Sequence, residues 1–199
     1  RLIHVGEQLS RHGITGLYSN SLFKYHDSAY SCLENCVEIG RGFIQKPYQK
    51  SKVLDYLWRG IFDFIKRYPD CKYMLGVLTI PRAFPEEMQK LIVNFYNMYF
   101  STAIDFCTPK ELFTAEDTQN DNPFSGKDFK HDWSILNHLL RENGYELPWP
   151  FKQSAKWFSP GGSSIISFTK DESFNSIAGL NLSVIDKLNQ TYFKHYLKG

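Results

Sequence analysis

The sequence predicts an α/β domain organised around a βαβ unit. An apolar segment from Val37 to Ile44 has the composition of a buried strand, and a helical pattern follows it from Ser51. A second uncharged apolar run, Tyr73 to Ile80, has the pattern of a strand covered on both faces. Because a helix connects the two strands, we expect them to be parallel, with a right-handed crossover. The 199 residues are enough for one domain with a sizeable core.

Both ends of the connecting helix are marked in the sequence. Ser51 is a typical N-cap residue. Pro69 prevents continuation beyond Lys66 and Arg67, whose charges suit a helix C-terminus. Apolar residues between these ends recur at the spacing of one helical face: Leu54, Leu57, Trp58, Ile61 and Ile65. The loop before Ser51 therefore joins the carboxyl end of a strand to a helix N-terminus, where open α/β sheets bind anionic ligands.

The middle of the chain predicts a helix followed by a long insertion. The helix begins at Pro85, and its apolar stripe consists of Met88, Leu91, Ile92, Phe95 and Tyr99. The stripe is either core or, in part, the wall of a tunnel for an apolar ligand. The segment 108–130 is polar, contains Pro and Gly, and lacks a sustained period. We expect it to be a mobile insertion within a single domain spanning 1–199.

The C-terminal third is expected to contain two more helices and a strand. Asp132 is the predicted cap of a helix that ends at Gly144. Residues 147–150 should be extended, because each proline restricts the residue before it. A strand is predicted at 164–169, and a last helix is predicted to start at Ser183.

Two charges interrupt the first predicted strand. Glu38 and Arg41 lie in a segment that otherwise has a buried composition. An unpaired buried charge is too costly to keep without a partner or a task. Taken alone, the two residues leave two interpretations open, a structural ion pair in the core or functional groups beside a cleft.

Several short motifs resemble one known family. They are the Glu-Ile-Gly-Arg of 38–41, the Pro-Tyr of 47–48, the Leu-Trp-Arg-Gly of 57–60 and the Tyr-Met-Leu-Gly of 73–76. This set resembles the long-chain N-acyltransferases grouped with ornithine-lipid and glycine-lipid synthases, often labelled hemolysins, in the Gcn5-related N-acyltransferase (GNAT) superfamily. Further similarity lies at Arg1-Leu2, at 18–23 and in the Asp-x-x-Phe of 171–174. The resemblance implies a mixed central sheet with flanking helices, and an N-terminal part of the fold missing before Arg1.

The resemblance also implies catalytic residues for acyl transfer from a thioester to an amine. Glu38 would be the base, directly or through a water. Arg41 would hold the acceptor's carboxylate or orient Glu38, since a guanidinium binds a carboxylate through two hydrogen bonds. Arg1 would join Arg41 in binding the acceptor.

Binding of the thioester is expected at the end of the same strand. In the superfamily, backbone N–H groups at a strand bulge meet the acyl oxygen, and here these would be Gly40, Gly42 and Phe43. The phosphopantetheine or its carrier protein would contact the next loop at Lys46, Tyr48, Lys50, Ser51 and Lys52. No tightly bound cofactor is expected. The co-substrate would be an acyl-phosphopantetheine, carried by acyl carrier protein or coenzyme A.

The implied function is transfer of a long-chain fatty acyl group, with or without a 3-hydroxyl, from acyl carrier protein to an amino acid. Glycine or ornithine would be the acceptor, and the reaction would be the first step of aminolipid synthesis. Acyl-homoserine lactone synthases share a Glu-x-x-Arg at the equivalent strand and remain an alternative that would need S-adenosylmethionine. A noncatalytic module that binds acyl carrier protein or lipid is the alternative from a different class.

The distribution of charge along the chain indicates which kinds of partner it can bind. The formal net charge of +2 and the lack of interleaved aromatic and basic residues argue against nucleic acid. Basic residues outnumber acidic ones between Arg41 and Lys72, which suits an acidic carrier protein. No run is apolar enough to cross a bilayer and no signal peptide is visible, so membrane contact would be peripheral, at the inner face.

The cysteines do not predict a metal site. Cys32 and Cys36 lack the second pair that a zinc site needs, and Cys71 and Cys107 are isolated. We expect all four to be reduced thiols in a cytoplasmic protein, and no metal to be bound.

Overall fold

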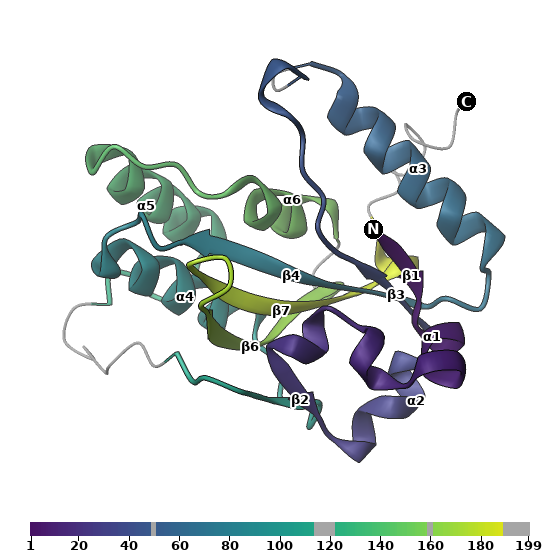
Figure 1. Ribbon diagram of the computed structural model, residues 1–199. Helices are drawn as coiled ribbons and strands as arrows, with labels where there is room; N and C mark the ends of the chain where they lie inside the picture. The colour runs from purple at the N-terminus through teal and green to yellow at the C-terminus, as the bar shows by residue number, and fades with distance from the viewer. Residues whose placement is uncertain (49–50, 114–121, 159–160, 189–199) are drawn as a thin grey trace.

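The computed structural model describes residues 1–48, 51–113, 122–158 and 161–188. A mixed five-stranded sheet in the order β1-β3-β4-β7-β6 forms its centre (Figure 1). The strands are β1 (Leu2–His4), β3 (Cys36–Ile39), β4 (Tyr73–Pro81), β7 (Ser176–Val184) and β6 (Ser163–Asp171). Only β3 and β4 are parallel; the other neighbours are antiparallel. A small second sheet pairs β2 (Phe23–Tyr25) with β5 (Cys107–Pro109).

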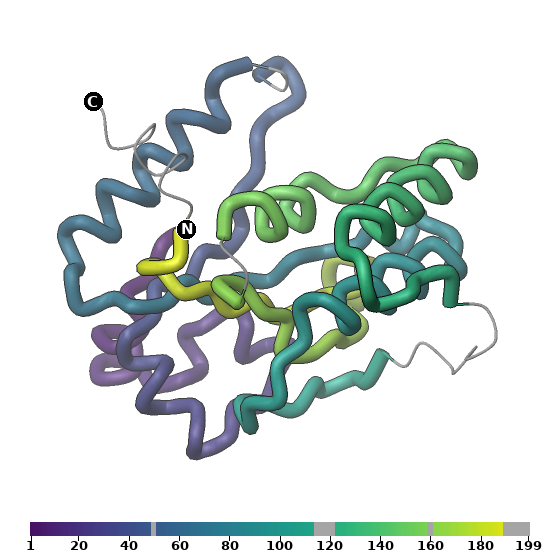
Figure 2. The backbone as a smooth tube through the Cα atoms, turned by 180° about the vertical axis from the view of Figure 1, so that it is seen from behind, coloured from purple at the N-terminus to yellow at the C-terminus, as the bar shows by residue number. Residues whose placement is uncertain are grey.

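Helices cover both faces of the central sheet. They are α1 (Val5–His12), α2 (Tyr30–Leu33), α3 (Val53–Arg67), α4 (Glu86–Phe100), α5 (Phe129–Glu142) and α6 (Trp149–Trp157). Short 3-10 turns lie at η1 (Ile14–Gly16), η2 (Ser19–Ser21), η3 (Asp27–Ala29), η4 (Lys46–Tyr48) and η5 (Ile185–Lys187). The segment with α1, α2 and the small sheet packs on one face, and α3 to α6 pack on the other. Both views show the chain that leaves β3 passing between α3 and α6 (Figures 1 and 2).

The structure confirms the βαβ unit. Strands β3 and β4 are parallel neighbours, with Glu38 opposite Leu75. Helix α3 begins at Val53, and its N-cap is Lys52 rather than the predicted Ser51, although the Val53 N–H donates to the Ser51 hydroxyl at 3.3 Å. The first strand is shorter than predicted, because it ends at Ile39. Arg41 adopts a φ of 53°, in the left-handed region, so the extended conformation cannot continue to residue 44.

The cap of α5 differs from the prediction. Asp128 is the N-cap, and its carboxylate accepts hydrogen bonds from the N–H groups of residues 130 and 131. Asp132 is instead fully buried and accepts hydrogen bonds from the Tyr99 hydroxyl (2.6 Å) and the Gly126 N–H (2.8 Å). The predicted C-terminus is confirmed. Gly144 has a φ of 78° and closes a Schellman motif, in which the next N–H reaches the carbonyl of residue 140.

Two predictions for the C-terminal third are wrong. Residues 147–150 are not all extended, because Pro148 is the N-cap of α6 and Pro150 lies in its first turn, where a proline costs no hydrogen bond. Ser183 lies in β7 and does not start a helix. The interior glycine of β7 is explained by packing, since a Cβ at Gly179 would approach the Phe168 ring to 2.7 Å.

The middle of the chain agrees in part with the prediction. The apolar stripe of α4 is part of the core together with residues of α5, α6 and the sheet. The predicted insertion contains ordered elements at both ends, because β5 pairs with β2 and Leu112 bridges to Thr169. Helix α5 already begins at Phe129. Residues 114–121 of the insertion lie outside the described part of the chain.

Candidate active site

A cavity of about 1370 Å³ opens along one edge of β4. Strand β3 pairs with β4 only as far as Ile39 opposite Gly76, whereas β4 continues to Pro81. Beyond Gly76, no strand of the described chain lies on this side of β4. Alternate residues of a strand direct both N–H and C=O to the same side, so this edge offers free backbone groups to a ligand.

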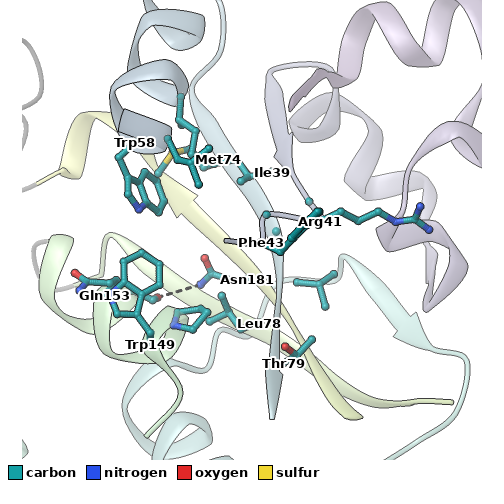
Figure 3. Close-up of a pocket in the computed structure, with 18 of the residues that line it drawn as sticks. Ile39, Arg41, Phe43, Trp58, Met74, Leu78, Thr79, Trp149, Gln153 and Asn181 are labelled. Atoms are coloured by element: carbon teal, nitrogen blue, oxygen red, sulfur yellow. Dashed lines mark hydrogen bonds between the residues drawn. The ribbon is translucent and has the colours of Figure 1, made fainter. Parts of the chain in front are cut away.

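The cavity extends on both faces of the sheet, because successive side chains of β4 point to opposite faces. We name its two parts by their residues. The tryptophan lobe, on the side of α3 and α6, is lined by Trp58, Met74, Leu78, Trp149 and Trp157. The Tyr18 lobe, on the side of the N-terminal segment, is lined by Tyr18, Arg41, Val77, Thr79, Phe174 and Ser176. Figure 3 shows Arg41 directed away from the tryptophans.

Three indole rings form one wall of the tryptophan lobe. Trp58 of α3 packs edge-on against Trp157 of α6, with ring centroids 4.1 Å apart. Trp149 lies about equally far from both, at 6.1 Å from Trp58 and 6.0 Å from Trp157. These contacts connect α3 to α6 over the sheet. The resulting wall is apolar.

The floor of the tryptophan lobe is polar. The Asn181 side-chain amide donates to the Ser163 hydroxyl (2.8 Å) and to the Ser164 carbonyl (3.1 Å). The Ser183 hydroxyl donates to the Asn181 side-chain oxygen at 2.9 Å, and the hydroxyls of Ser154 and Ser163 are 2.7 Å apart. Because the network is paired internally, it holds Asn181 and Ser183 in fixed positions at the cavity surface.

Glu38 lies behind the Tyr18 lobe rather than in it. The residue is 3% exposed and is not among those that line the cavity. Its carboxylate accepts hydrogen bonds from the Tyr18 N–H (3.1 Å), the Ser19 N–H (2.9 Å) and the Ser19 hydroxyl. The described residues include no ion pair between Glu38 and Arg41. The carboxylate therefore fixes the backbone that places the Tyr18 ring.

The predicted acceptor-binding arginines both line the cavity. The guanidinium carbon of Arg41 lies 5.4 Å from the centre of the Tyr18 ring. The positive φ of Arg41 is uncommon for a residue with a side chain, and such strain concentrates at functional sites. The Arg1 guanidinium donates to the Gly16 carbonyl at 2.8 Å.

The predicted oxyanion donors do not lie on a strand bulge. Gly40, Gly42 and Phe43 line the cavity, but β3 has already ended, and the register shift of this sheet lies in β6 near residue 166. The Gly40 N–H is occupied by the Arg1 carbonyl at 3.0 Å. Phe43 is 77% exposed at the mouth of the cavity.

The basic loop stands away from the sheet (Figure 1). Lys46 and Tyr48 are exposed in η4, and Ser51 and Lys52 are exposed before α3. None of these four lines the cavity, whereas the flanking segments 42–44 and 54–58 do. Lys50 lies outside the described residues.

Besides its contacts with Glu38 and Arg41, Tyr18 is held in place by the turn between β6 and β7. Its hydroxyl donates to the buried Asp171 carboxylate at 2.9 Å, and the other Asp171 oxygen accepts from the Phe174 N–H at 3.3 Å. The Phe174 ring packs edge-on against Tyr18. Burial and the hydrogen bond to Asp171 raise the pKa of Tyr18 well above its ordinary value, so the phenol stays protonated at neutral pH and acts as a hydrogen-bond donor to Asp171.

One group of metal-ligand residues lies outside the cavity. Ligand atoms of His4, Asp70 and Cys71 lie within 4.8 Å of one another. His4 Nδ1 accepts the Glu7 N–H at 3.1 Å, so its proton resides on Nε2, which faces Asp70 at 3.0 Å. Burial also raises the pKa of Cys71 to about 11. Both ring nitrogens of His4 are thus engaged within the protein, and the Cys71 thiol stays protonated at neutral pH, where it is a poor metal ligand.

Sequence reasoning missed the contribution of α6 and β7. Trp149 and Trp157 escaped notice because the segment that begins α6 was predicted to be extended. Asn181 and Ser176 escaped notice because β7 was not predicted. A helical spacing that places Trp149, Gln153 and Trp157 on one face was the signal that could have found α6.

Comparison with known proteins gives two kinds of match. Residues 1–59 match the acetyltransferase (GNAT) domain family. A glycine N(alpha)-acyltransferase of Phocaeicola vulgatus is 28% identical over 151 residues, which is 71% of this chain and 46% of the relative. One from Bacteroides thetaiotaomicron is 27% identical over 142 residues, 66% of this chain and 42% of the relative. The chain thus spans less than half the length of these curated relatives.

A search of solved structures and a search for membrane-spanning helices both gave negative results. No solved structure matches the chain. In the described ranges, no helix is both long and apolar enough to span a bilayer.

Proposed function

Because the fold and the relatives support membership of the GNAT N-acyltransferase family, we propose that this chain carries the site of an N-acyltransferase. The enzyme would move a long-chain acyl group from a phosphopantetheine thioester to the amino group of an amino acid such as glycine or ornithine. The supporting observation is the cavity along the free edge of β4, which joins an apolar lobe to a lobe lined by arginine. A thioester on one side of this edge can meet an amine from the other.

The proposed reaction forms an amide without a covalent enzyme intermediate. The amine nitrogen attacks the thioester carbonyl carbon, a C–N bond forms and the C–S bond breaks. Of the three protons on the acceptor ammonium, one stays on the amide nitrogen, one reaches the thiolate that leaves, and one is released to solvent. The free N–H groups of β4, with those of Gly42 and Phe43, are the proposed donors to the carbonyl oxygen as negative charge develops there.

The tryptophan lobe is the proposed site of the acyl chain. Its indole rings suit methylene groups, and Asn181 and Ser183 give a 3-hydroxyl a polar partner on the floor. Aminolipid synthesis is the proposed role, since the product would be a fatty acid linked to an amino acid.

Glu38 has a geometry that supports a positioning role. The resemblance predicts it to be the base, but its oxygens accept three hydrogen bonds and it does not line the cavity. We therefore propose that Glu38 holds Tyr18 and Ser19 in place, and that the acceptor loses its proton to water in the cavity.

The basic loop is the proposed docking surface for an acidic acyl carrier protein. Lys46, Lys52 and Arg59 are exposed near the cavity mouth, where Tyr56 and Leu57 are also exposed. Release of a lipid product at the inner face of a membrane would use the same rim, through Phe43. A cytoplasmic location is consistent with four free cysteines.

The experiment is product analysis with the full-length enzyme. Purified protein is incubated with acyl carrier protein or coenzyme A thioesters and a panel of amino acids. Equal amounts of free thiol and N-acyl amino acid are expected. Release of methylthioadenosine with S-adenosylmethionine would instead identify a lactone synthase. Tight binding of the thioester without thiol release would identify a binding module.

A further inference from the structure

Ser176 carries a buried hydroxyl with no hydrogen-bond partner. Among the described residues, the Ser176 hydroxyl is the buried side-chain polar group that lacks a hydrogen-bond partner. The residue is only 3% exposed, and it lines the cavity. A buried hydroxyl without a partner is costly, so a site that keeps one merits an explanation in terms of a ligand.

The local structure explains why the protein does not pair this hydroxyl itself. Ser176 is the first residue of β7, and its neighbour in β4 is Pro81, which has no N–H to offer. Its neighbour in β6 is Asp171, whose carboxylate is oriented toward Tyr18 and Phe174 by the hydrogen bonds that it accepts from them. The hydroxyl thus has no partner on either neighbouring strand, and it belongs to a residue that lines the cavity.

The charges around the Tyr18 lobe favour an anion. Arg41 lines this lobe, and Arg1, whose guanidinium donates to the Gly16 carbonyl, also lines the cavity. The carboxylates nearby, Glu38 and Asp171, are buried and accept hydrogen bonds from Tyr18 and its neighbours, so neither is directed into the lobe. Among the described residues Arg41 forms no ion pair, and its guanidinium lies over the Tyr18 ring.

We infer that Ser176 and Arg41 together bind the carboxylate of the acceptor amino acid in the Tyr18 lobe. Arg41 supplies the charge, and the Ser176 hydroxyl donates a hydrogen bond to a carboxylate oxygen. The α-amino group then points toward the free edge of β4. This inference rests on the proposed function and adds to it a residue, Ser176, that determines specificity for a free carboxylate.

The test compares Ser176→Ala with a matched control, Ser167→Ala. Ser167 lies in the neighbouring strand β6 and does not line the cavity. In the full-length enzyme, Ser176→Ala should raise the KM for glycine about tenfold, the effect of one hydrogen bond to a charged group, and leave the KM for the thioester unchanged. Its Tm should not fall, because the hydroxyl has no partner in the protein to lose. Ser167→Ala should leave the KM for glycine unchanged.

A second measurement separates this inference from the proposed function. Binding of glycine and of glycinamide, which lacks the carboxylate, is measured by calorimetry without thioester. A preference for glycine over glycinamide that falls about tenfold in Ser176→Ala supports the subsite even if no acyl transfer is found. Acyl transfer with the same KM for glycine in Ser176→Ala and parent overturns the subsite and leaves the proposed function intact. Equal binding of glycine and glycinamide by the parent also overturns it.

Discussion

At the scale of single residues, Glu38 shows how a buried charge is kept without an ion pair. The backbone N–H groups of Tyr18 and Ser19, with the Ser19 hydroxyl, surround the carboxylate. The Tyr25 hydroxyl donates to Ser19 Oγ at 2.7 Å and extends the network. Hydrogen bonds to a charged group replace the water that the carboxylate loses on burial.

Substituting Glu38 should therefore lower stability. Glu38→Gln replaces one carboxylate oxygen by an amide NH₂ group. This group cannot accept the hydrogen bond that the backbone N–H donates to that oxygen. We expect the free energy of unfolding to fall by about 2 to 3 kcal/mol. Urea denaturation of the variant and parent measures this difference.

The exposed Glu34 provides the control, since Glu34→Gln should change the unfolding free energy very little. If Glu38→Gln instead keeps the parent's stability but yields no N-acyl product, a direct catalytic role for Glu38 is the better account.

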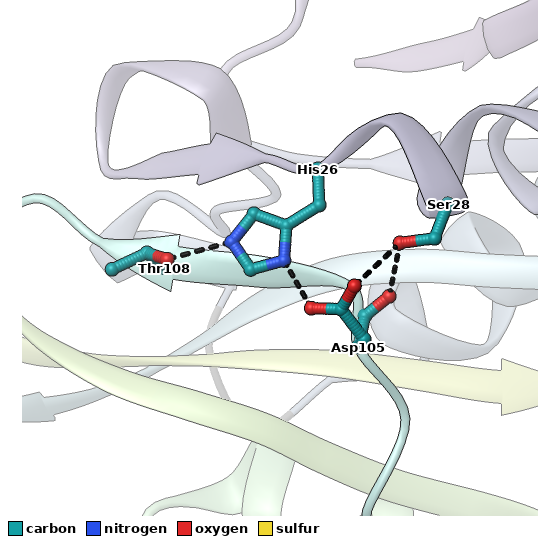
Figure 4. Close-up of polar contacts among 4 residues, drawn as sticks. All are labelled: His26, Ser28, Asp105 and Thr108. Atoms are coloured by element: carbon teal, nitrogen blue, oxygen red, sulfur yellow. Dashed lines mark hydrogen bonds and ion pairs between the residues drawn. The ribbon is translucent and has the colours of Figure 1, made fainter.

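At the scale of elements, a polar cluster connects two segments far apart in the sequence (Figure 4). His26, next to β2, pairs with Asp105 through Nδ1 and with Thr108 of β5 through Nε2 at 2.6 Å. The Ser28 hydroxyl donates to the Asp105 carbonyl at 2.6 Å. The hydrogen bond from His26 lowers the pKa of Asp105 below its ordinary value. The cluster resembles a catalytic triad, but it is largely exposed and lies apart from the cavity residues, so we assign it to holding β2 against β5.

Asp105 should stabilise the fold in a pH-dependent way. Its pKa is lower in the folded than in the unfolded chain, so the stabilisation is present above the unfolded value and is lost as pH falls through the folded value. Asp105→Asn should lower the Tm at pH 7, and the difference from the parent should shrink at acidic pH below 3.8, the ordinary pKa. Asp27→Asn, at an exposed position of the same segment, is the control and should change the Tm very little at pH 7. A difference that stays constant with pH would contradict the assignment.

The contact of α3 with α6 leads to a prediction about the donor. Trp58→Ala removes the ring that joins the two helices and opens the tryptophan lobe. We expect the unfolding free energy to fall by about 2 kcal/mol. Relative to the parent, the substitution should raise the KM for long-chain thioesters more than the KM for short-chain ones. Steady-state kinetics with thioesters of different chain lengths measures the second effect.

Trp133→Ala is the matched control for this prediction. Trp133 stacks on Phe129 of α5 and does not line the cavity. Its loss should lower stability without changing the KM for any donor. An equal rise in KM for both variants would show that reduced stability, not the lobe, causes the effect.

Local signals predicted the elements that obey simple rules. Helix α3 has a clear apolar period and β4 a continuous apolar run, so both were predicted nearly to the residue. Strand β7 was missed, because Gly179, Asn181 and Ser183 disfavour a strand until Phe168 and the serine network are in place. Helix α6 was missed because a proline such as Pro148 or Pro150 breaks a helix in its interior but is tolerated in its first turn.

At the scale of the whole molecule, the site depends on contacts that a single sequence does not reveal. The resemblance identified Arg41 and the loop after β3, which are local in sequence. The cavity also needs Tyr18 from the N-terminal segment, Trp157 from α6 and Ser176 from β7. Only the sheet order, with β4 between β3 and β7, brings these segments together. That is why the motif residues were predictable and the two lobes were not.

The distribution of charge over the molecule leads to the last prediction. Lys46 and Lys52 are exposed on the loop beyond the cavity mouth and do not line the cavity, so they can affect a carrier protein but not the acyl chain itself. The double variant Lys46→Glu/Lys52→Glu should raise the KM for an acyl carrier protein thioester at least about tenfold, because it turns attraction into repulsion. The KM for the coenzyme A or pantetheine thioester should change much less. Lys24→Glu, on β2 at the opposite face of the sheet, is the control for a charge reversal elsewhere on the surface and should leave both values unchanged. Raising the salt concentration should weaken carrier-protein use by the parent and reduce the difference between parent and variant, since exposed charges are screened. If the double variant uses both donors as well as the parent does, the carrier protein docks elsewhere or is not the donor.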